Sequence, residues 1–256
     1  MIWNSLRGIA VAWVLPAALL AQAPKQLTIA AASDLQAALP EIVRAFEGSA
    51  PVRVTVSYGS SGTFFAQIQN GAPFDLFLSA DMDYPRQLAK AGLADASTLQ
   101  QYATGHLVLW ARRESKLDLS RGLAALTDAR VRRVAIANPK YAPYGRAAVA
   151  ALRSARLYDT VQAKLVMGES LAQAAQLVES GNADIGLLSR SLALGPALQA
   201  EGIYGDVRAP YPAIEQAGII VKTSREPALA RAFMAFLRRD DTGRQLERFG
   251  FTVPSR

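Results

Sequence analysis

Four junctions along the chain combine small or hydroxyl-bearing residues with the expected start of a helix. They are residues 30–35 (AAASDL), 57–63 (SYGSSGT), 142–146 (APYGR) and 167–171 (MGESL). A helix N-terminus exposes unpaired N–H groups and carries a partial positive charge of roughly half an elementary charge. Several such ends around one cavity would bind an anion without lysine or arginine, and serine hydroxyls would add donors.

Each junction taken alone has a simpler explanation, because serine at a helix start usually only caps the helix. The functional interpretation therefore rests on the four junctions together. In open α/β sheets ligands lie beyond the carboxyl ends of the strands, and these loops fall there. The sequence predicts an anion site at that edge.

The elements that would position these junctions alternate between strands and helices. Apolar or alternating segments predict strands at 27–31, 52–58, 74–79, 106–111, 134–137, 164–166, 184–188 and 218–221. Helical spacing predicts helices at 34–46, 62–69, 84–91, 146–156, 170–180 and 227–238, with residues 139–145 as a loop. Pro40 should kink or divide the first helix. This alternation indicates an α/β protein with mostly parallel sheets flanked by helices.

Composition narrows the chemistry further. The chain of 256 residues has no cysteine and one histidine, which argues against structural zinc, thiol catalysis, disulfides and histidine-rich metal sites. Its net charge is +7, with short basic clusters near the ends of apolar segments. Solvated surface charge explains these clusters better than a nucleic-acid site does.

The N-terminal segment is typical of an export signal. Arg7 precedes an apolar run over residues 8–20, followed by the small-x-small triplet Ala21-Gln22-Ala23. An N-terminal anchor helix is the alternative, although Pro16 interrupts the run. We expect residues 1–23 to be a signal peptide that is cleaved near Ala23, and the protein to be periplasmic.

Several segments resemble the periplasmic molybdate-binding proteins of ABC importers, which are class II periplasmic binding proteins. They are LTIAAASDLQAAL, VSYGSSGTFFAQIQNGAPFDLFLSAD, VAIANPKYAPYGRAA, ADIGLLS and the ending RQLERFGF. The similarity extends from about Leu27 to Val253. Its most specific parts are the AAAS run, the GSSGT to GAPFDLFLSAD block, the PYG segment and the C-terminal FGF.

The resemblance implies four residues that bind the anion. Ser33, which closes the AAAS run, and Ser61 of the serine-rich turn donate their hydroxyls. Tyr144, between the proline and glycine of PYG, donates a backbone N–H and, in some members, its hydroxyl. Leu171, at the start of a later helix, donates another backbone N–H.

Four further residues are weaker candidates. Ser60 and Ser170 adjoin two of the residues above. Some members use a tyrosine where this chain has Ser189, which implies that the donor moves to Tyr144. Asp34 follows Ser33 directly, and a carboxylate facing a dianion would repel it or accept a proton from hydrogen phosphate. We favour Asp34 pointing to solvent in the first helical turn; the other arrangement would make phosphate the better ligand.

The family fold implied by the resemblance has two lobes joined by a hinge. The first lobe would comprise residues 24–104 and 218–256, and the second residues 105–217. The ligand would be molybdate or tungstate, with no cofactor and no free cation site. The implied partner is an inner-membrane ABC permease. We expect a monomer that binds no nucleic acid and is not an enzyme.

Other functions remain as alternatives. A binding protein for phosphate, sulfate or ferric iron would share the fold, although iron proteins would be expected to use paired tyrosines with histidine or carboxylates. An enzyme is disfavoured, because Gly59-Ser60-Ser61-Gly62 is not a nucleophile elbow and phosphate-loop and dinucleotide motifs are missing from the sequence. His106, in an apolar segment, is interpreted as structural. A transcription-factor effector lobe would need a DNA-binding helix-turn-helix upstream, where the export signal lies.

Overall fold

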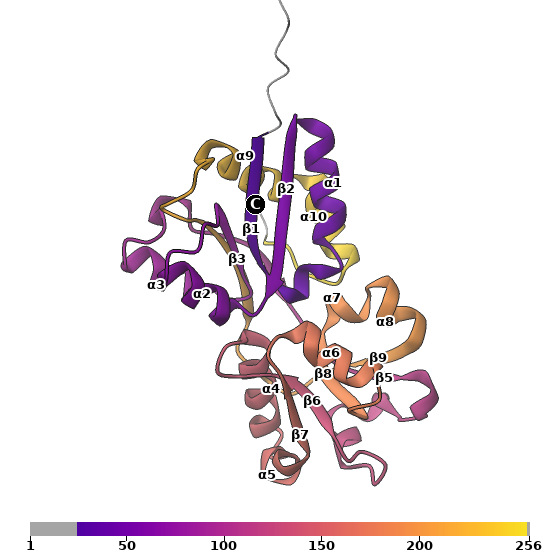
Figure 1. Ribbon diagram of the computed structural model, residues 1–256. Helices are drawn as coiled ribbons and strands as arrows, with labels where there is room; N and C mark the ends of the chain where they lie inside the picture. Colours follow the sequence, from indigo (N-terminus) through magenta and orange to yellow (C-terminus); the bar gives the residue numbers. More distant parts are fainter. Residues whose placement is uncertain (1–24, 255–256) are drawn as a thin grey trace, which may run out of the picture.

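A computed structural model describes residues 25–254 and has two lobes, each built on a five-stranded sheet (Figure 1). The predicted signal segment, residues 1–23, lies outside the described residues. The N-terminal strand and the C-terminal helices share one lobe, whereas the middle of the chain forms the other (Figure 1).

The sheet of the first lobe has the strand order β2-β1-β3-β10-β4. These strands are β1 (Lys25–Ala32), β2 (Val52–Gly59), β3 (Leu76–Ser79), β4 (Gln100–Gly105) and β10 (Ile214–Ile220). β1 pairs in parallel with β2 and β3, and β10 pairs antiparallel with β3 and β4. A strand from late in the chain thus occupies an interior position of this sheet.

The sheet of the second lobe has the order β7-β6-β8-β5-β9. Its strands are β5 (Leu107–Arg112), β6 (Val134–Ala137), β7 (Leu165–Gly168), β8 (Ile185–Ser189) and β9 (Gly202–Asp206). β6 pairs in parallel with β7 and β8, and β5 pairs antiparallel with β8 and β9.

The two-lobe α/β fold is confirmed, and its sheets are mixed where mostly parallel sheets were expected. The reason lies in how the chain crosses between the lobes. It leaves the first sheet through β4, enters the second through β5 after His106, leaves through β9 and returns through β10. In each lobe, one strand carries the chain toward the other lobe and its neighbour carries the chain back. The two strands therefore run in opposite directions, which makes β4–β10 and β5–β9 antiparallel.

Helices cover both faces of the first sheet (Figure 1). One face packs against α1 (Leu39–Ser49), α9 (Pro227–Leu237) and α10 (Asp240–Arg248), and the other against α2 (Ser61–Gln69) and α3 (Asp83–Lys90). β1 shows why: Leu27 and Ile29 face the first group, whereas Ala30 faces the second. An apolar strand without polar alternation is typical of a sheet buried on both sides.

Pro40 divides the first helical segment, as predicted. Residues Ser33–Gln36 form a short 3-10 turn, and α1 starts at Leu39 with Pro40 in its first turn. Proline is tolerated there because the first N–H groups of a helix have no partner within the helix. The turn at Ser33 is therefore separate from the helix that follows it.

The helices of the second lobe surround its own apolar core. They are α4 (Pro143–Ser154), α5 (Tyr158–Val161), α6 (Leu171–Glu179), α7 (Arg190–Ala193) and α8 (Pro196–Glu201). In the described part of the chain, no helix is both long and apolar enough to cross a bilayer.

One boundary differs from expectation in a way that matters for the site. The loop predicted over residues 139–145 ends early, because α4 begins at Pro143. Proline at the first helical position has a preset φ and lacks the N–H that would otherwise be unpaired. Tyr144 and Gly145 therefore belong to the first turn of α4.

Candidate functional site

The helix N-termini of the two lobes meet at one small cavity. Its volume is about 10 Å³, roughly the room that one water molecule needs. The first residues of α2, α4 and α6 and the ends of β1, β2 and β3 contribute its walls. The lining residues are Ala32, Ser33, Gly59, Ser60, Ser61, Ala80, Ala142, Pro143, Tyr144 and Leu171.

The four main sequence candidates all line this cavity, and all are buried. Ser33, Ser61, Tyr144 and Leu171 are each at most 3% exposed. The weaker candidate Ser60 also lines it. Residues more than 100 positions apart in the chain are thus brought together by the ends of strands and helices, as the junction pattern suggested.

The two serines of the first lobe are held by backbone N–H groups. Ser33 Oγ accepts from the Ala172 N–H at 3.3 Å, which crosses from one lobe to the other. Ser61 Oγ accepts from the Ala80 N–H at 2.9 Å. A hydroxyl that accepts in this way keeps its own proton for donation. Both serines are therefore fixed in position and retain a donor.

The second lobe brings backbone groups to the cavity. Tyr144 follows Pro143 in the first turn of α4, and Leu171 is the first residue of α6. N–H groups at these positions have no partner within their own helix. Gly145 allows α4 to begin against β6, because a Cβ there would lie 2.1 Å from the Ala137 carbonyl oxygen. This close packing explains the glycine of the PYG segment.

The hydroxyl of Tyr144 reaches away from these N–H groups into the first lobe. It accepts from Gln216 Nε2 at 3.4 Å, and it lies against Gly105, where a Cβ would come within 2.0 Å of it. Tyr102 donates to Gln216 Oε1 at 3.0 Å. The Tyr144 hydroxyl is therefore engaged with the buried cluster around Gln216.

Asp34 takes part in the same buried cluster, and the expectation that it points to solvent is wrong. Its side chain is only 1% exposed, since the 3-10 turn after β1 lies beneath the second lobe. Oδ2 accepts from Gln216 Nε2 at 2.5 Å, whereas Oδ1 has no hydrogen-bond partner. Burial raises the pKa of Asp34 to about 6, although contacts with Gln216 and Tyr144 oppose the rise.

Asp34 is also not among the residues that line the cavity. It is adjacent to Ser33 in the chain, but its carboxylate faces Gln216 of β10. The arrangement that would have favoured hydrogen phosphate, a carboxylate lining the cavity as an acceptor, is not what the structure has.

The structure does not bring the other two weaker candidates to the cavity. The Ser170 hydroxyl caps α6 by accepting from the Gln173 N–H at 3.2 Å. The Ser189 hydroxyl caps α7 by accepting from the Leu192 N–H at 3.2 Å, and it is fully buried. Their oxygens serve the helices that follow them.

Sequence reasoning missed several parts of the site. Ala80 follows β3 and lines the cavity, and the strand-end rule that pointed to the other loops could have identified it. Gln216 and Tyr102 gave no such signal, because a polar residue within a strand does not reveal which distant residue it will contact.

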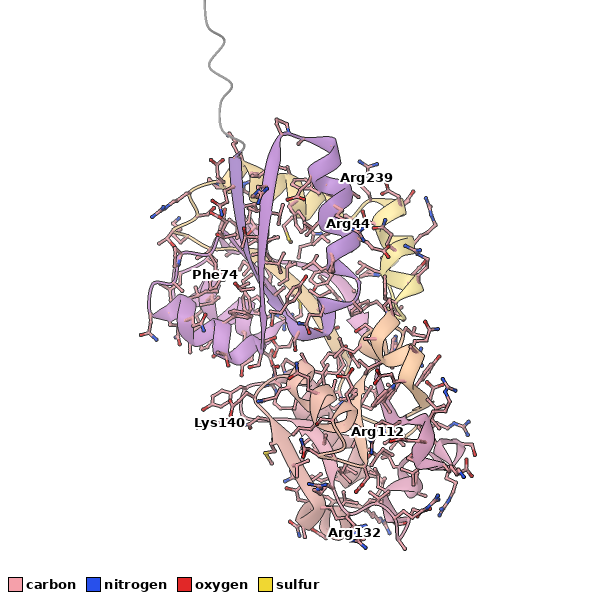
Figure 2. All side chains as sticks on the ribbon, turned by 45° about the vertical axis from the view of Figure 1, so that its right-hand side comes forward. Arg44, Phe74, Arg112, Arg132, Lys140 and Arg239 are labelled. Carbon is pink, nitrogen blue, oxygen red and sulfur yellow. The ribbon has the colours of Figure 1, made fainter. Side chains whose placement is uncertain are left out.

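The cavity has no charged lining residue among residues 25–254. Basic side chains are instead spread over both lobes, as the labels Arg44 and Arg239 on one lobe and Arg112 and Arg132 on the other show (Figure 2). Within the same described range, no group of three or more histidine, cysteine or acidic residues could hold a metal cation. The chemistry available at the cavity is donation of hydrogen bonds to an anion.

Comparisons with known proteins agree with this geometry. A family model for bacterial extracellular solute-binding proteins matches residues 27–252. The molybdate-binding protein ModA of Rhodobacter capsulatus is 34% identical over 244 residues, which cover 95% of this chain and 94% of that protein. ModA of Azotobacter vinelandii is 35% identical over 230 residues, covering 88% of this chain and 89% of that protein.

Solved structures agree as well. The periplasmic molybdate-binding protein of Azotobacter vinelandii superposes with a TM-score of 0.82 at 31% identity, covering 90% of this chain and 100% of that one. The match to the family model and these relatives span nearly all of the described residues. The chain therefore belongs to the family of bacterial extracellular solute-binding proteins.

Proposed function

We propose that this protein captures molybdate, or the equally shaped tungstate, between its lobes and delivers it to an ABC permease of the inner membrane. The observation that carries the proposal is the convergence of helix N-termini from both lobes on one small, uncharged cavity with serine hydroxyls. The molybdate-binding relatives support the same ligand.

In this proposal four groups hold the anion. The hydroxyls of Ser33 and Ser61 donate from the first lobe, and the N–H groups of Tyr144 and Leu171 donate from the second. Ser60 is an additional candidate at the same wall. Each charge-assisted hydrogen bond contributes roughly 1.5–3 kcal/mol, so several together offset much of the cost of removing a dianion from water.

Selectivity would come from two properties of the cavity: it offers only hydrogen-bond donors, and its dimensions suit an ion of one size. A fully ionised tetrahedral dianion accepts at all four oxygens, whereas a protonated anion brings a hydrogen that needs an acceptor. No carboxylate lines the described cavity. A cage of fixed dimensions can also favour the larger molybdate over sulfate, because its donors would stand too far from the smaller ion.

Closure of the lobes would be part of binding. Ser33 and Ser61 belong to one lobe and Tyr144 and Leu171 to the other, so the ion is reached by all four only in the closed form. We place the first lobe at residues 25–105 and 214–254, because β4 ends at Gly105 and β10 pairs with β3 and β4. The second lobe is then residues 106–213, slightly shorter than the sequence suggested.

The proposal includes export and a role in transport. Removal of residues 1–23 would leave a periplasmic protein, as described for the relative from Azotobacter vinelandii. The protein would act as a monomer that binds its ligand without chemical conversion. Its partner would be the permease, which recognises the closed form.

A calorimetric titration of the mature protein tests the ligand. Molybdate and tungstate should both bind saturably at one site, sulfate more weakly, and phosphate weakest. Tighter binding of phosphate, or no binding of any of the four anions, would refute the proposed function.

A further inference from the structure

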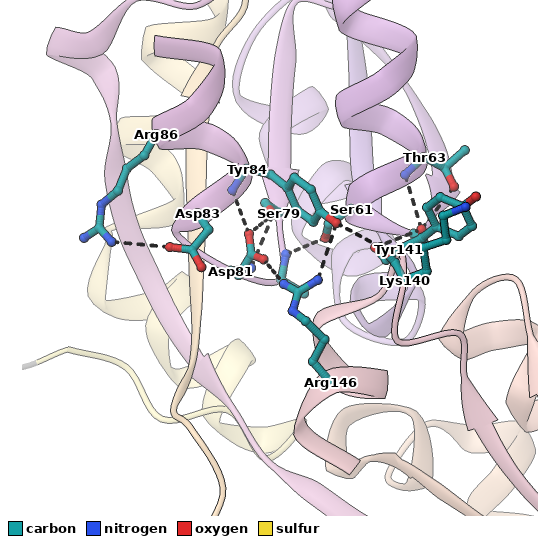
Figure 3. Close-up of polar contacts among 12 residues, drawn as sticks. Ser61, Thr63, Ser79, Asp81, Asp83, Tyr84, Arg86, Lys140, Tyr141 and Arg146 are labelled. Carbon is teal, nitrogen blue, oxygen red and sulfur yellow. Dashed lines mark hydrogen bonds and ion pairs between the residues drawn. The ribbon is translucent and has the colours of Figure 1, made fainter. Parts of the chain in front are cut away.

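A group of polar contacts joins the two lobes next to Ser61, which lines the cavity (Figure 3). Its centre is an ion pair between Arg146 Nη2, on α4, and Asp81 Oδ2, two residues after β3 ends at Ser79. Neither residue lines the cavity, and neither has a role in the proposed binding of the anion. Anion binding therefore does not explain the presence of this ion pair.

The Asp81 carboxylate is oriented by its own lobe. Oδ1 accepts from the Tyr84 N–H at 3.1 Å and from the Ser79 hydroxyl at 3.0 Å. Its side chain is only 13% exposed. Burial raises the pKa of Asp81 above its ordinary value, and the charge of Arg146 opposes that rise. Oδ2 is thus presented to the second lobe, where Arg146 compensates a carboxylate that has lost most of its water.

Arg146 makes two further contacts with the first lobe, both to Tyr84. Nη1 donates to the Tyr84 hydroxyl at 3.4 Å, and the guanidinium carbon lies 5.4 Å from the centre of the ring. The same hydroxyl donates to the Lys140 carbonyl of the second lobe at 3.5 Å. One arginine of the second lobe thereby engages a carboxylate and an aromatic ring of the first (Figure 3).

These contacts are directly connected to the walls of the cavity. Asp81 follows Ala80, whose N–H holds the Ser61 hydroxyl oxygen. Arg146 lies two residues after Tyr144 in the first turn of α4. The ion pair can therefore form only when the loop that holds Ser61 and the helix end that carries Tyr144 approach each other.

Backbone contacts beside the pair need the same approach. The Gly62 N–H donates to the Tyr141 carbonyl at 2.8 Å, and the Ser60 hydroxyl donates to it at 3.2 Å. A Cβ at Gly62 would lie 2.8 Å from that carbonyl oxygen. A side chain there would hold the lobes apart, so glycine permits closure at this position.

We propose that Arg146 and Asp81 form a latch that stabilises the closed form and so sets how long the anion is retained. This inference rests on the proposed function, since it assigns positioning residues to the same site. The latch stabilises the closed form through one positive and one negative side chain that both lie outside the cavity. The cavity itself stays uncharged, and discrimination by donors and size is preserved.

Kinetics of molybdate binding test the latch. In the Arg146→Gln variant the dissociation rate should rise about tenfold, because a carboxylate that is only 13% exposed loses its partner, while the association rate changes less than about twofold. Arg86→Gln is the matched control. Arg86 pairs with Asp83 at 3.8 Å within α3, and this exposed pair does not cross the lobes (Figure 3). Its variant should release the anion at the wild-type rate.

A second variant separates the latch from a general loss of stability. Asp81→Asn should also speed release, and the double variant should release no faster than Arg146→Gln alone, because both changes remove one interaction. Additive effects, or an unchanged release rate in Arg146→Gln, would overturn the latch.

Distances between the lobes provide a readout that does not depend on the ligand. The chain has no cysteine, so spin labels at Lys90→Cys and Met167→Cys report the separation of the two lobes without background. Arg146→Gln should shift the distribution toward longer distances. Failure of the wild type to bind any anion would refute the proposed function. Identical distance distributions in the wild type and the variant would refute the latch, whatever the ligand.

Discussion

The two lobes bring different chemistry to the same cavity. In the proposed site, the first lobe contributes the side-chain hydroxyls of Ser33 and Ser61, and the second contributes backbone N–H groups at the starts of α4 and α6. Side-chain donors depend on residue type and can be removed by a conservative substitution. Backbone donors depend on where a helix begins, and almost any residue can supply them. The donors of the first lobe therefore depend on which residue occupies a position, whereas those of the second depend on where a helix begins.

The largest effect should come from the hydroxyl half. Replacing both Ser33 and Ser61 by alanine removes two charge-assisted donors, and we expect the dissociation constant for molybdate to rise at least about a hundredfold. Calorimetry of the single and double variants measures this. Wild-type affinity in the double variant would show that the first lobe binds the ion by other groups.

The carboxyl group of Asp34, buried beside the cavity, should lower the stability of the folded protein at neutral pH. Its pKa is about 6 in the folded protein against 3.8 as its ordinary value. The folded state thus binds the proton more tightly, so stability from this group is fully present below pH 3.8 and is lost as the pH rises through 6. The loss at pH 7.5 is at most about 3 kcal/mol.

We therefore expect Asp34→Asn to raise the midpoint of thermal unfolding at pH 7.5 relative to the wild type, with a smaller gain at pH 4.5. Unfolding curves of both proteins at the two pH values measure the effect. Asp83→Asn, at an exposed position of α3, is the control and should show no such dependence. An Asp34→Asn variant that is less stable at pH 7.5 would contradict the expectation.

The backbone half can be tested at Leu171, where proline fits the helix. Leu171 is the first residue of α6, and Ser170 before it is extended at φ −131° and ψ 170°, which suits a following proline. Leu171→Pro removes one N–H and should weaken molybdate binding about tenfold or more. Leu171→Ala keeps the N–H and controls for the lost side chain. Equal affinities in the two variants would refute a role for this N–H.

The smallest effect should come from Ser170, whose hydroxyl serves α6 and not the cavity. Ser170→Ala should lower the free energy of unfolding by about 1 kcal/mol, as for a lost helix cap, and change the molybdate affinity less than about twofold. Chemical denaturation and calorimetry on the same sample check both parts. A large loss of affinity would place Ser170 in the binding set.

The contrast between lobes also explains which parts of the site could be predicted from the sequence. Ser33 and the serines of the turn at 57–63 stand out by residue type where a strand is followed by a helix, and the location of strand ends then places them at one edge of the sheet; the resemblance to a family selected Ser61 among them. Leu171 and Tyr144 carry no such mark, and the resemblance to a family supplied them. The start of α4 at Pro143 was missed, although proline at a first helical position is a known signal.

Contacts between distant residues could not be predicted in this way. Asp34 and Gln216 are 182 positions apart and meet only because β10 enters the first sheet. Asp81 and Arg146 come from different lobes, and their pairing depends on how far the lobes close. A polar residue in an apolar strand or a charge at a loop has many possible partners, and tertiary packing selects among them.

The position of β10 has a consequence for how the protein acquires its structure. The first sheet cannot be completed until residues 214–220 are available, because this strand fills the place between β3 and β4. The second lobe uses one uninterrupted stretch, from β5 to β9, and can assemble from contacts closer in sequence. During synthesis from the N-terminus, β1 to β4 would be made before β10, with which β3 and β4 pair. The second lobe would therefore fold before the first lobe is complete.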